Sequence, residues 1–309
     1  MLRANACLKT FLSASLVSCA LLVLSPLSAH ADTLVRVDTD VGSFVLELYP
    51  DTAPATVTNF LSYVDSNAYD GTLIHRSVPN FVIQGGGFRF DPDTVMFPAI
   101  PKSDPVVNEF SRSNLRGTIA MAKFAGDPNS ATSEWFINMQ NNSANLDGQN
   151  GGFTVFGKVI GNGMTVVDAI GNLAIGAVDG NSTFGEIPYI SARTNFLVDI
   201  DWVDLTMLSL STSSKFESGL LSVALDAGTA GRALVDFKIT QNTPATVITL
   251  EPSSVVFIGT TVDKMASFDT VAGELLIPEL EVSGSIAYRN LRFQLTDPDS
   301  YSFTLVSFD

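Results

Sequence analysis

The sequence predicts a mainly β protein: a closed antiparallel barrel covered by two helices, followed by a small all-β domain of the sandwich type. Two observations lead to this prediction. Short runs of alternating apolar and polar residues recur along the chain, and only two segments carry the apolar spacing of a helix. Beyond residue 219 the strand-like runs continue without any helical stripe. A chain of 309 residues has room for two such parts.

Strand-like runs make up most of the first part. Residues 34–38 and 43–48 alternate and are joined by a turn at 40–42, which is typical of a strand hairpin. Comparable runs follow at 73–76, 81–84, 118–122, 135–138, 154–159 and 202–210. A loop bearing Pro and Asp separates residues 88 and 116. Many short strands of this kind favour a closed antiparallel barrel.

Two short helices are expected among these strands. Val57, Phe60, Leu61 and Val64 fall at i, i+3, i+4 and i+7, which places them on one face of a helix that begins near Pro54. A second helix is expected over residues 164–171. Both are short enough to cover the ends of a barrel rather than to form a layer of their own.

The second part reads as all-β. Its expected strands are residues 220–225, 233–240, 246–250, 255–258, 274–277, 286–295 and 301–306. The polar stretch 213–218 is expected to be a linker, which divides the chain into domains at 32–212 and 219–309. The acids Asp297, Asp299 and Asp309 are interpreted as turn and terminal residues rather than calcium ligands.

The N-terminus has the form of an export signal. A basic start precedes an almost continuous apolar run at 11–27, and a small-x-small site ends at Ala31, so cleavage is expected before Asp32. Two alternatives stay open: a lipoprotein signal with a modified Cys19, and a retained membrane anchor. On the first interpretation the mature protein is periplasmic or extracellular and has no membrane span.

Removal of residues 1–31 excludes several kinds of chemistry. Cys7 and Cys19 are both lost, so no disulfide or thiol nucleophile remains, and His75 is the one histidine left. No metal site or cofactor is therefore expected. The mature chain keeps 15 basic and 32 acidic residues, a net charge of −17. Such a charge disfavours binding to nucleic acid or to anionic membranes and favours solubility.

The most informative stretch is 69–88, which contains His75, Arg76 and Gln84 followed by three glycines. Further motifs follow in order: GTIAMA at 117–122, NSATSEWFI at 129–137, NLDG at 145–148 and VFGKV at 155–159, with APATVTNF upstream at 53–60. With these motifs at this spacing, residues 33–211 resemble the cyclophilins.

The resemblance implies an eight-stranded barrel with peptidyl-prolyl cis-trans isomerase activity. It implies that Arg76 is the catalytic arginine and that Gln84 and Ala122 hold the substrate backbone and the pocket rim. It gives the walls of the proline pocket as Phe81, Val82, Phe136 and Leu146. Two positions depart from the family: Glu134 stands where a glutamine is usual, and Phe153 stands where many members have histidine. Both are included among the expected substrate-binding residues.

The chemistry is consistent with these residues. Rotation about the bond before proline meets a barrier of roughly 18–20 kcal/mol, and no covalent bond breaks. No nucleophile, metal or cofactor is needed. A fixed donor aimed at the proline nitrogen stabilises the twisted amide more than either planar form. Arginine is suited to this because it is planar, permanently charged and rich in donors. The expected partners are proline-containing segments of exported polypeptides, and a monomer is expected.

Other interpretations stay open at this point. Arg76 taken alone fits a surface ion pair, Phe81 and Phe136 fit a plain core, and His75 fits a structural strand residue better than a base. Two other functions compete with the isomerase. One is a proline-peptide binding module with little turnover, for example because Glu134 pairs with Arg76. The other is a surface protein in which the C-terminal domain acts in targeting or adhesion.

Overall fold

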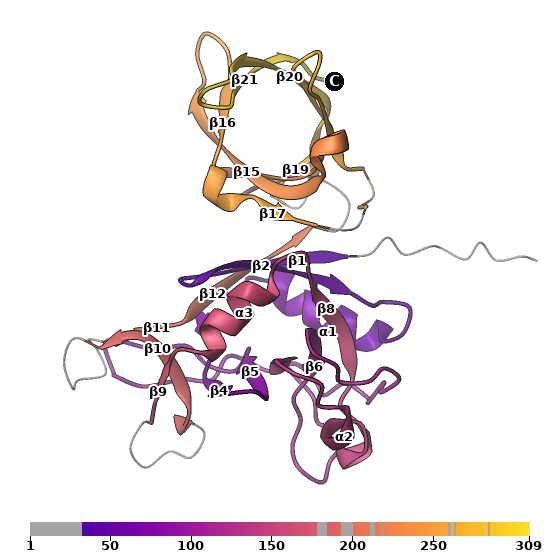
Figure 1. The fold of residues 1–309 in the computed structure, drawn as a ribbon, viewed down its shortest axis with the longest axis vertical. Coiled ribbons are helices and arrows are strands. Elements are labelled where there is room, and N and C mark those ends of the chain that lie inside the picture. Colours follow the sequence, from indigo (N-terminus) through magenta and orange to yellow (C-terminus); the bar gives the residue numbers. More distant parts are fainter. Residues whose placement is uncertain are drawn as a thin grey trace, which may run out of the picture.

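A computed structural model describes residues 33–177, 184–192, 200–210, 214–217, 219–258, 261–262, 264–283 and 285–309. The expected signal segment and its cleavage site lie outside these residues. The described strands form two large sheets and one small sheet, and the second large sheet lies above the first in Figure 1. Among the described residues, no helix combines the length and the apolar character needed to cross a membrane.

The first large sheet, called here the first sheet, has the strand order β3-β12-β1-β2-β8-β6-β7-β5-β4. Its strands are β1 (Leu34–Thr39), β2 (Gly42–Leu48), β3 (Thr72–Leu73), β4 (Arg76–Val78), β5 (Val82–Gly85), β6 (Thr118–Met121), β7 (Trp135–Asn138), β8 (Val155–Ile160) and β12 (Asp204–Leu210). All its pairings are antiparallel. Every strand expected in this part of the sequence is present, and the loop between residues 88 and 116 contains no named strand or helix.

The two ends of the first sheet are joined by the chain itself. Only Ile74 and His75 separate β3 from β4. The Ile74 N–H donates to Val203 O at 3.0 Å, and the His75 N–H donates to Gln84 O at 3.1 Å. The expected strand at 73–76 is thus split between the two edges of the sheet, and the sheet curls into the expected barrel of eight strands when β3 and β4 are counted as one segment.

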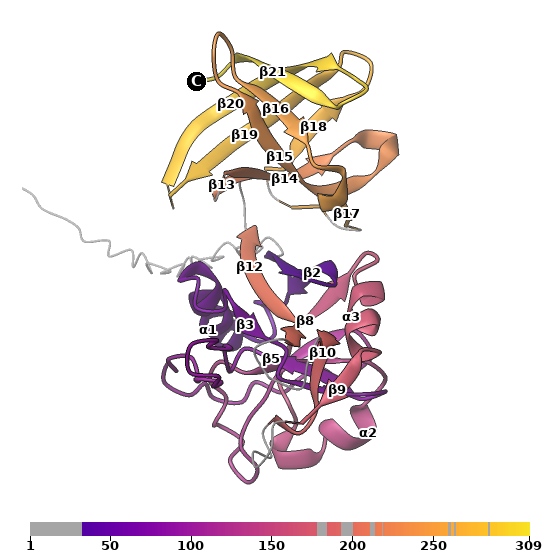
Figure 2. The ribbon, with the colours of Figure 1, turned by 90° about the vertical axis from the view of Figure 1, so that its left-hand side faces the viewer.

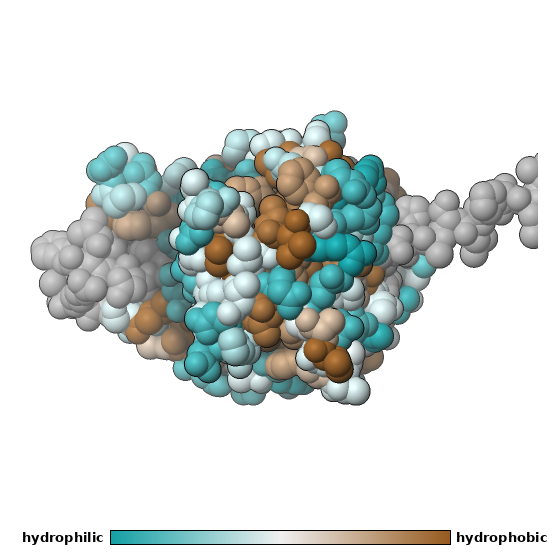
Figure 3. Space-filling model, turned by 90° about the horizontal axis from the view of Figure 1, so that it is seen from above, coloured by the Kyte–Doolittle hydropathy of each residue, from teal (hydrophilic) through white to brown (hydrophobic). Residues whose placement is uncertain are grey.

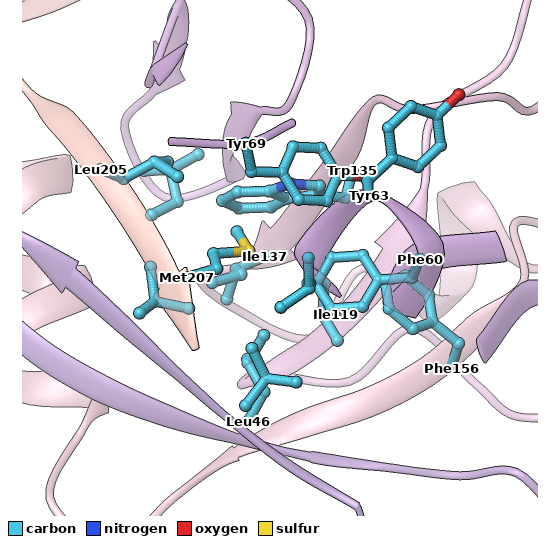
Figure 4. Close-up of a cluster of buried hydrophobic side chains, with 14 of the residues drawn as sticks. Leu46, Phe60, Tyr63, Tyr69, Ile119, Trp135, Ile137, Phe156, Leu205 and Met207 are labelled. Atoms are coloured by element: carbon cyan, nitrogen blue, oxygen red, sulfur yellow. The ribbon is translucent and has the colours of Figure 1, made fainter. Parts of the chain in front are cut away.

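A large apolar core fills this barrel (Figure 4). Alternation along the strands explains its composition, because Ile83, Ile119, Trp135 and Ile137 all point inward and are almost fully buried. Phe60 of the first helix packs among them, 5.0 Å from the ring of Phe156. Burial of side chains of this size is the main source of stability for a domain of this kind.

Among the described residues, three α-helices accompany the first sheet: α1 (Pro54–Asp65), α2 (Ser143–Leu146) and α3 (Met164–Gly171). The expected helices are confirmed as α1 and α3, and α2 is a single additional turn. Helix α1 has no side-chain cap of its own. The carboxylate of Glu109 replaces it and accepts from the N–H groups of Ala55 at 3.1 Å and Thr56 at 2.8 Å. The long loop is thereby attached to the helix.

The small sheet was not expected from the sequence. It has the order β11-β10-β9, with β9 (Ala174–Gly176), β10 (Ile187–Ala192) and β11 (Ile200–Trp202). An aromatic cluster joins it to the long loop; its members are Leu73, Phe88, Phe90, Phe97, Phe184, Ile187 and Tyr189. The rings of Phe88 and Phe184 meet edge to face at 4.9 Å. This small sheet is therefore packed firmly next to β3 and β4.

The second large sheet forms a closed barrel, called here the C-terminal barrel and visible end-on in Figure 1. Its strands are β13 (Ser214–Glu217), β14 (Leu220–Asp226), β15 (Arg232–Gln241), β16 (Val247–Leu250), β17 (Val256–Phe257), β18 (Ala266–Asp269), β19 (Glu274–Val282), β20 (Ser285–Asp297) and β21 (Ser302–Ser307). Pairing runs from β14 through β18, β19, β20, β21, β16 and β15 back to β14. The ring encloses one apolar core.

Two expectations for this part need correction. The all-β character is confirmed, but the strands close into one barrel instead of a two-sheet sandwich, because β14 pairs with β15 on one edge and with β18 on the other. The expected linker 213–218 contains a strand, because residues 214–217 pair with β14 and also with β19. Polar composition indicated a linker, but Ser214 is buried.

Alternation also separates the inside of the C-terminal barrel from its outside. Leu291 and Phe293 are buried, whereas Arg292 and Gln294 between and beyond them are exposed. The outer face seen from above mixes apolar and polar residues (Figure 3). Asp297 makes a turn, as expected, since its carboxylate accepts from the Asp299 N–H at 3.0 Å and from the Ser300 hydroxyl at 2.7 Å.

The C-terminal barrel lies above the end of the first sheet that carries β2 (Figure 2), and it packs on side chains of β1, β2 and β8. A separate apolar cluster spans the two; its buried members are Leu34, Val45 and Ile160 on one side and Leu234, Val256, Ile258 and Val262 on the other. Within this interface Arg36 Nη1 donates to Asp236 Oδ2 at 2.5 Å, with both side chains less than a tenth exposed. Asp236 also accepts from the Ser222 hydroxyl at 2.7 Å.

Loss of this buried ion pair is expected to destabilise the protein. In Asp236→Ala, Arg36 stays buried with only Asp38 as a partner, which is expected to cost about 3 kcal/mol of unfolding free energy. Urea unfolding measures the change. The matched control is Asp226→Ala, which removes the exposed pair with Arg232 and is expected to cost less than about 1 kcal/mol. If both variants lost the same free energy of unfolding, the buried pair would contribute no more to stability than the exposed pair, and the prediction would be wrong.

Asp204 is expected to make stability depend on pH. Partial desolvation and the nearby carboxylate of Asp40 raise the pKa of Asp204 from 3.8 to about 6, although the residue as a whole is exposed. The folded state therefore holds this proton more tightly than the unfolded chain does, so the contribution of Asp204 to stability is lost as pH rises through about 6. Asp204→Asn is expected to raise the Tm at a pH of about 7.5, with a smaller gain at about 4.5. Asp51→Asn, at an exposed turn, is the control. If the Tm of Asp204→Asn rose equally at both pH values, the raised pKa of Asp204 would not be the cause.

Candidate functional site

Four of the sequence-predicted site residues, Arg76, Val82, Gln84 and Phe136, lie on three neighbouring strands and share one face of the sheet. Register places Arg76 of β4 opposite Gln84 of β5, and Gln84 opposite Phe136 of β7. Phe136 in turn lies opposite Ala120 of β6, which pairs with Val155 of β8. Residues directly opposite each other share a face of the sheet. This row therefore forms the outer surface of the barrel wall, while the residues between its members face the core.

Most of the residues expected to line the proline pocket form an apolar cluster on this outer face. It is a cluster distinct from the barrel core, with buried Val82, Ala120, Phe136, Leu146 and Val155, and with Tyr49, Phe81, Ala122 and Phe153 partly buried around them. Six expected pocket residues thus lie together: Phe81, Val82, Ala122, Phe136, Leu146 and Phe153. The rings of Phe136 and Phe153 meet at 5.7 Å in an edge-to-face arrangement.

Buried amide side chains fix the loops that carry the pocket walls. Asn142 Nδ2 donates to Phe81 O at 2.9 Å and to Asn138 Oδ1 at 2.8 Å. Asn114 Nδ2 donates to Asp147 Oδ1 at 3.0 Å and to Phe153 O at 3.2 Å. Asn114, Asn138 and Asn142 are all buried. A buried amide that lost such partners would be costly, so the network holds the three loops in one arrangement.

Lys123 lies at the edge of the apolar cluster, next to Phe153. Its Nζ donates to Asn150 O at 2.8 Å and to Gly152 O at 2.5 Å, and lies 4.9 Å from the centre of the Phe153 ring. Burial lowers the pKa of this amine, with Asp127 opposing that shift. The ammonium thus contacts these two backbone oxygens and the face of the Phe153 ring, the latter as a cation–π contact.

Glu134 connects the outer face to the residues behind it. Its Oε2 accepts from Gln84 Nε2 at 3.0 Å and lies 3.4 Å from His75 Nε2, and its Oε1 lies 3.5 Å from Lys102 Nζ. Burial opposes ionisation, but contacts with His75, Gln84 and Lys102 outweigh it and hold the pKa of Glu134 below its usual value. The side chain is therefore a carboxylate at neutral pH and can only accept hydrogen bonds.

This contact determines how the amide of Gln84 is oriented. Because a carboxylate has no donor, the NH₂ group of Gln84 must face Glu134 and its Oε1 must face away. Gln84 Oε1 has no hydrogen-bond partner among the residues that the structure describes. A pocket of about 220 Å³ opens beside it, lined by Gln84, Lys102, Ala122, Lys123, Phe124, Ser130, Thr132 and Glu134. His75 is only 1% exposed, so it lies out of reach of a substrate.

A tight backbone path after β5 brings Glu134 close to Gln84. Gly86 has a φ of +80°, and a Cβ at this position would lie 2.6 Å from Ser133 O. Three glycines in succession follow Gln84 and permit this path. A larger residue here would push the chain away from β7.

Arg76 has a partner that the sequence did not indicate. Its Nε donates to Glu186 Oε2 at 3.1 Å, and the two side chains are 36% and 41% exposed. No contact between Arg76 and Glu134 is present among the described residues, so the pairing considered from the sequence is replaced by one with Glu186. Glu186 was missed because it lies 110 positions further along the chain. Neither composition nor alternation relates residues so far apart.

The part of the chain that carries this site also matches known proteins. Residues 34–193 match the family model described as cyclophilin type peptidyl-prolyl cis-trans isomerase/CLD. A peptidyl-prolyl cis-trans isomerase of Acinetobacter baylyi is 46% identical over 152 residues, which cover 48% of this chain and 77% of that protein. Peptidyl-prolyl cis-trans isomerase A of Dickeya dadantii is 40% identical over 166 residues, covering 52% of this chain and 84% of that protein.

Two further matches were found. Peptidyl-prolyl cis-trans isomerase B of Escherichia coli is 38% identical over 152 residues, covering 46% of this chain and 87% of that protein. Among solved structures, a cyclophilin type isomerase of Cryptosporidium parvum, crystallised in the presence of the dipeptide Ala-Pro, has a TM-score of 0.43 and 23% identity. That match covers 58% of this chain and 99% of the other.

Proposed function

This chain belongs to the cyclophilin-type peptidyl-prolyl cis-trans isomerases and is an enzyme of that kind, and from this premise we propose that Arg76 catalyses the rotation. The proline ring of the substrate would occupy the pocket formed by Phe81, Val82, Phe136 and Leu146. The single observation that carries the proposal is the row across the sheet: a permanently charged donor lies one strand from Val82 and two strands from Phe136 of the apolar cluster, on the same face.

The physical argument concerns the twisted state of the amide. As the bond rotates, resonance is lost and the proline nitrogen gains a lone pair that can accept a hydrogen bond. The guanidinium of Arg76 would donate to this nitrogen and so stabilise the twisted state more than either planar state. The apolar pocket would hold the ring, which keeps one side of the bond fixed while the other side turns. These steps use no nucleophile or cofactor.

We assign Gln84 and Glu134 a shared role in holding the substrate backbone. Since Glu134 keeps the NH₂ of Gln84 occupied, Gln84 Oε1 would accept from a backbone N–H of the bound segment. Glu134 would then act on the substrate through Gln84 rather than through Arg76. Ala122 and Phe153 would form the rim beside this contact.

We also propose that the clients are exported polypeptides. Support comes from the sequence of residues 1–31, which has the charge, apolar run and cleavage site of an export signal. A strongly acidic mature chain suits an enzyme that meets unfolded segments outside the cytoplasm without precipitating. The interpretation as a binding module without turnover has no observation in its favour, because the relatives that match are named as isomerases.

Replacement of Arg76 tests the catalytic proposal. In Arg76→Ala, kcat/KM for a proline peptide is expected to fall roughly 10²- to 10³-fold, as for the loss of one preorganised donor in other enzymes. Arg76→Lys is expected to recover little, because lysine lacks the planar set of donors. A proline-isomerisation assay gives the rates, and Arg116→Ala, an exposed arginine paired with Asp168, is the control. Wild-type rates in Arg76→Ala would rule the proposal out.

Replacement of Glu134 tests the orientation of Gln84. Glu134→Leu removes the acceptor and is expected to raise KM roughly tenfold, the loss of one hydrogen bond to a charged group, with a smaller effect on kcat. Glu134→Gln keeps an acceptor and is expected to restore part of the affinity. Steady-state kinetics with a proline peptide separate the two parameters. Unchanged kcat and KM in both variants would remove Glu134 from the site.

A further inference from the structure

We propose that Glu186 is a positioning residue for the reaction: it holds Nε of Arg76 and so leaves the terminal amino groups of the guanidinium for the substrate. This inference rests on the catalytic role proposed for Arg76. It adds to the site a residue from the small sheet region, outside the strands that carry the pocket. It also explains why an exposed arginine would keep one orientation.

The contact engages one edge of the guanidinium only. Nε donates to Glu186 Oε2 at 3.1 Å, and within the described part of the chain neither terminal nitrogen of Arg76 has a hydrogen-bond partner. Because the guanidinium is planar, fixing Nε to a carboxylate restricts rotation of the whole group. The remaining donors are therefore presented from a restricted orientation on the face that also carries Gln84.

Glu186 is itself held firmly despite its exposed side chain. Phe184 and Ile187 on either side of it are buried, at 4% and 0% exposure, in the aromatic cluster next to β3 and β4. The Ser77 N–H donates to Glu186 O at 2.7 Å. Since Ser77 follows Arg76 directly, the backbone of Glu186 is bonded to the strand that carries the arginine.

A purely stabilising role of the pair between Glu186 and Arg76 explains this arrangement less well than a positioning role does. Exposed ion pairs contribute only about 0–1 kcal/mol to stability, because solvent screens them. The effect on catalysis is different in kind, since a small misplacement of a catalytic group lowers the rate strongly. The opposing possibility is that Glu186 diverts Arg76 from the substrate, and this predicts a rate change of the opposite sign.

The test is steady-state kinetics of the purified protein with a proline peptide. Glu186→Ala is expected to lower kcat roughly 5- to 20-fold with little change in KM, because positioning is lost while the pocket stays intact. Glu186→Gln, which keeps an acceptor for Nε, is expected to recover much of the loss. The double variant Arg76→Ala/Glu186→Ala is expected to be no slower than Arg76→Ala, since both changes act through one group.

Asp168→Ala provides the matched control. Asp168 pairs with Arg116 at 2.6 Å, and this ion pair is about as exposed as the pair of Arg76 and Glu186. Loss of the Asp168 side chain is expected to leave kcat unchanged. The Tm of each variant shows that it folds. A kcat in Glu186→Ala equal to or above the wild-type value overturns the inference. If Arg76→Ala also keeps the wild-type rate, the proposed function fails as well; if Arg76→Ala is slow, only the role of Glu186 is lost.

Discussion

Everything at the site depends on strand alternation in β4 to β8. Ile83 and Ile137 face the barrel core, and their neighbours Gln84 and Phe136 therefore face outward. A shift of one residue in the strand pairing would bury Gln84 and expose Ile83. The stabilisation from burying several apolar side chains would then be lost. The same burial that stabilises the fold thus fixes the outer row on which the pocket and the arginine lie.

Alternation alone leaves the outward side chains free to move, and the structure restricts them by hydrogen bonds from behind. Gln84 is held by Glu134, and Arg76 by Glu186. Buried asparagines hold the carbonyl groups of Phe81 and Phe153. A site arranged in this way loses little entropy when substrate binds, which is what preorganisation requires.

Much of the fold and of the site could be predicted from the sequence, and there is a physical reason why the rest could not. Strand and helix positions follow from local periodicity, and the motifs around Arg76 and Gln84 lie within a few residues of one another. Glu186 and Asn114 meet their partners only after the chain has folded, because their contacts join segments far apart in sequence. The C-terminal barrel illustrates the same limit: alternation indicated its strands, but which edges of β14 are paired is a matter of long-range closure.

The placement of the C-terminal barrel follows from the same division of surfaces. It packs on Leu34, Val45 and Ile160, which belong to β1, β2 and the end of β8, whereas the outer row runs from β4 to the start of β8. Strand β8 therefore contributes Val155 to the pocket cluster at one end and Ile160 to the interface at the other. The buried pair of Arg36 and Asp236 makes this interface specific as well as apolar, since a shifted docking would leave both charges buried without a partner across the interface. Because the two surfaces share only β8 and use its opposite ends, the C-terminal barrel is held in place without covering the outer row.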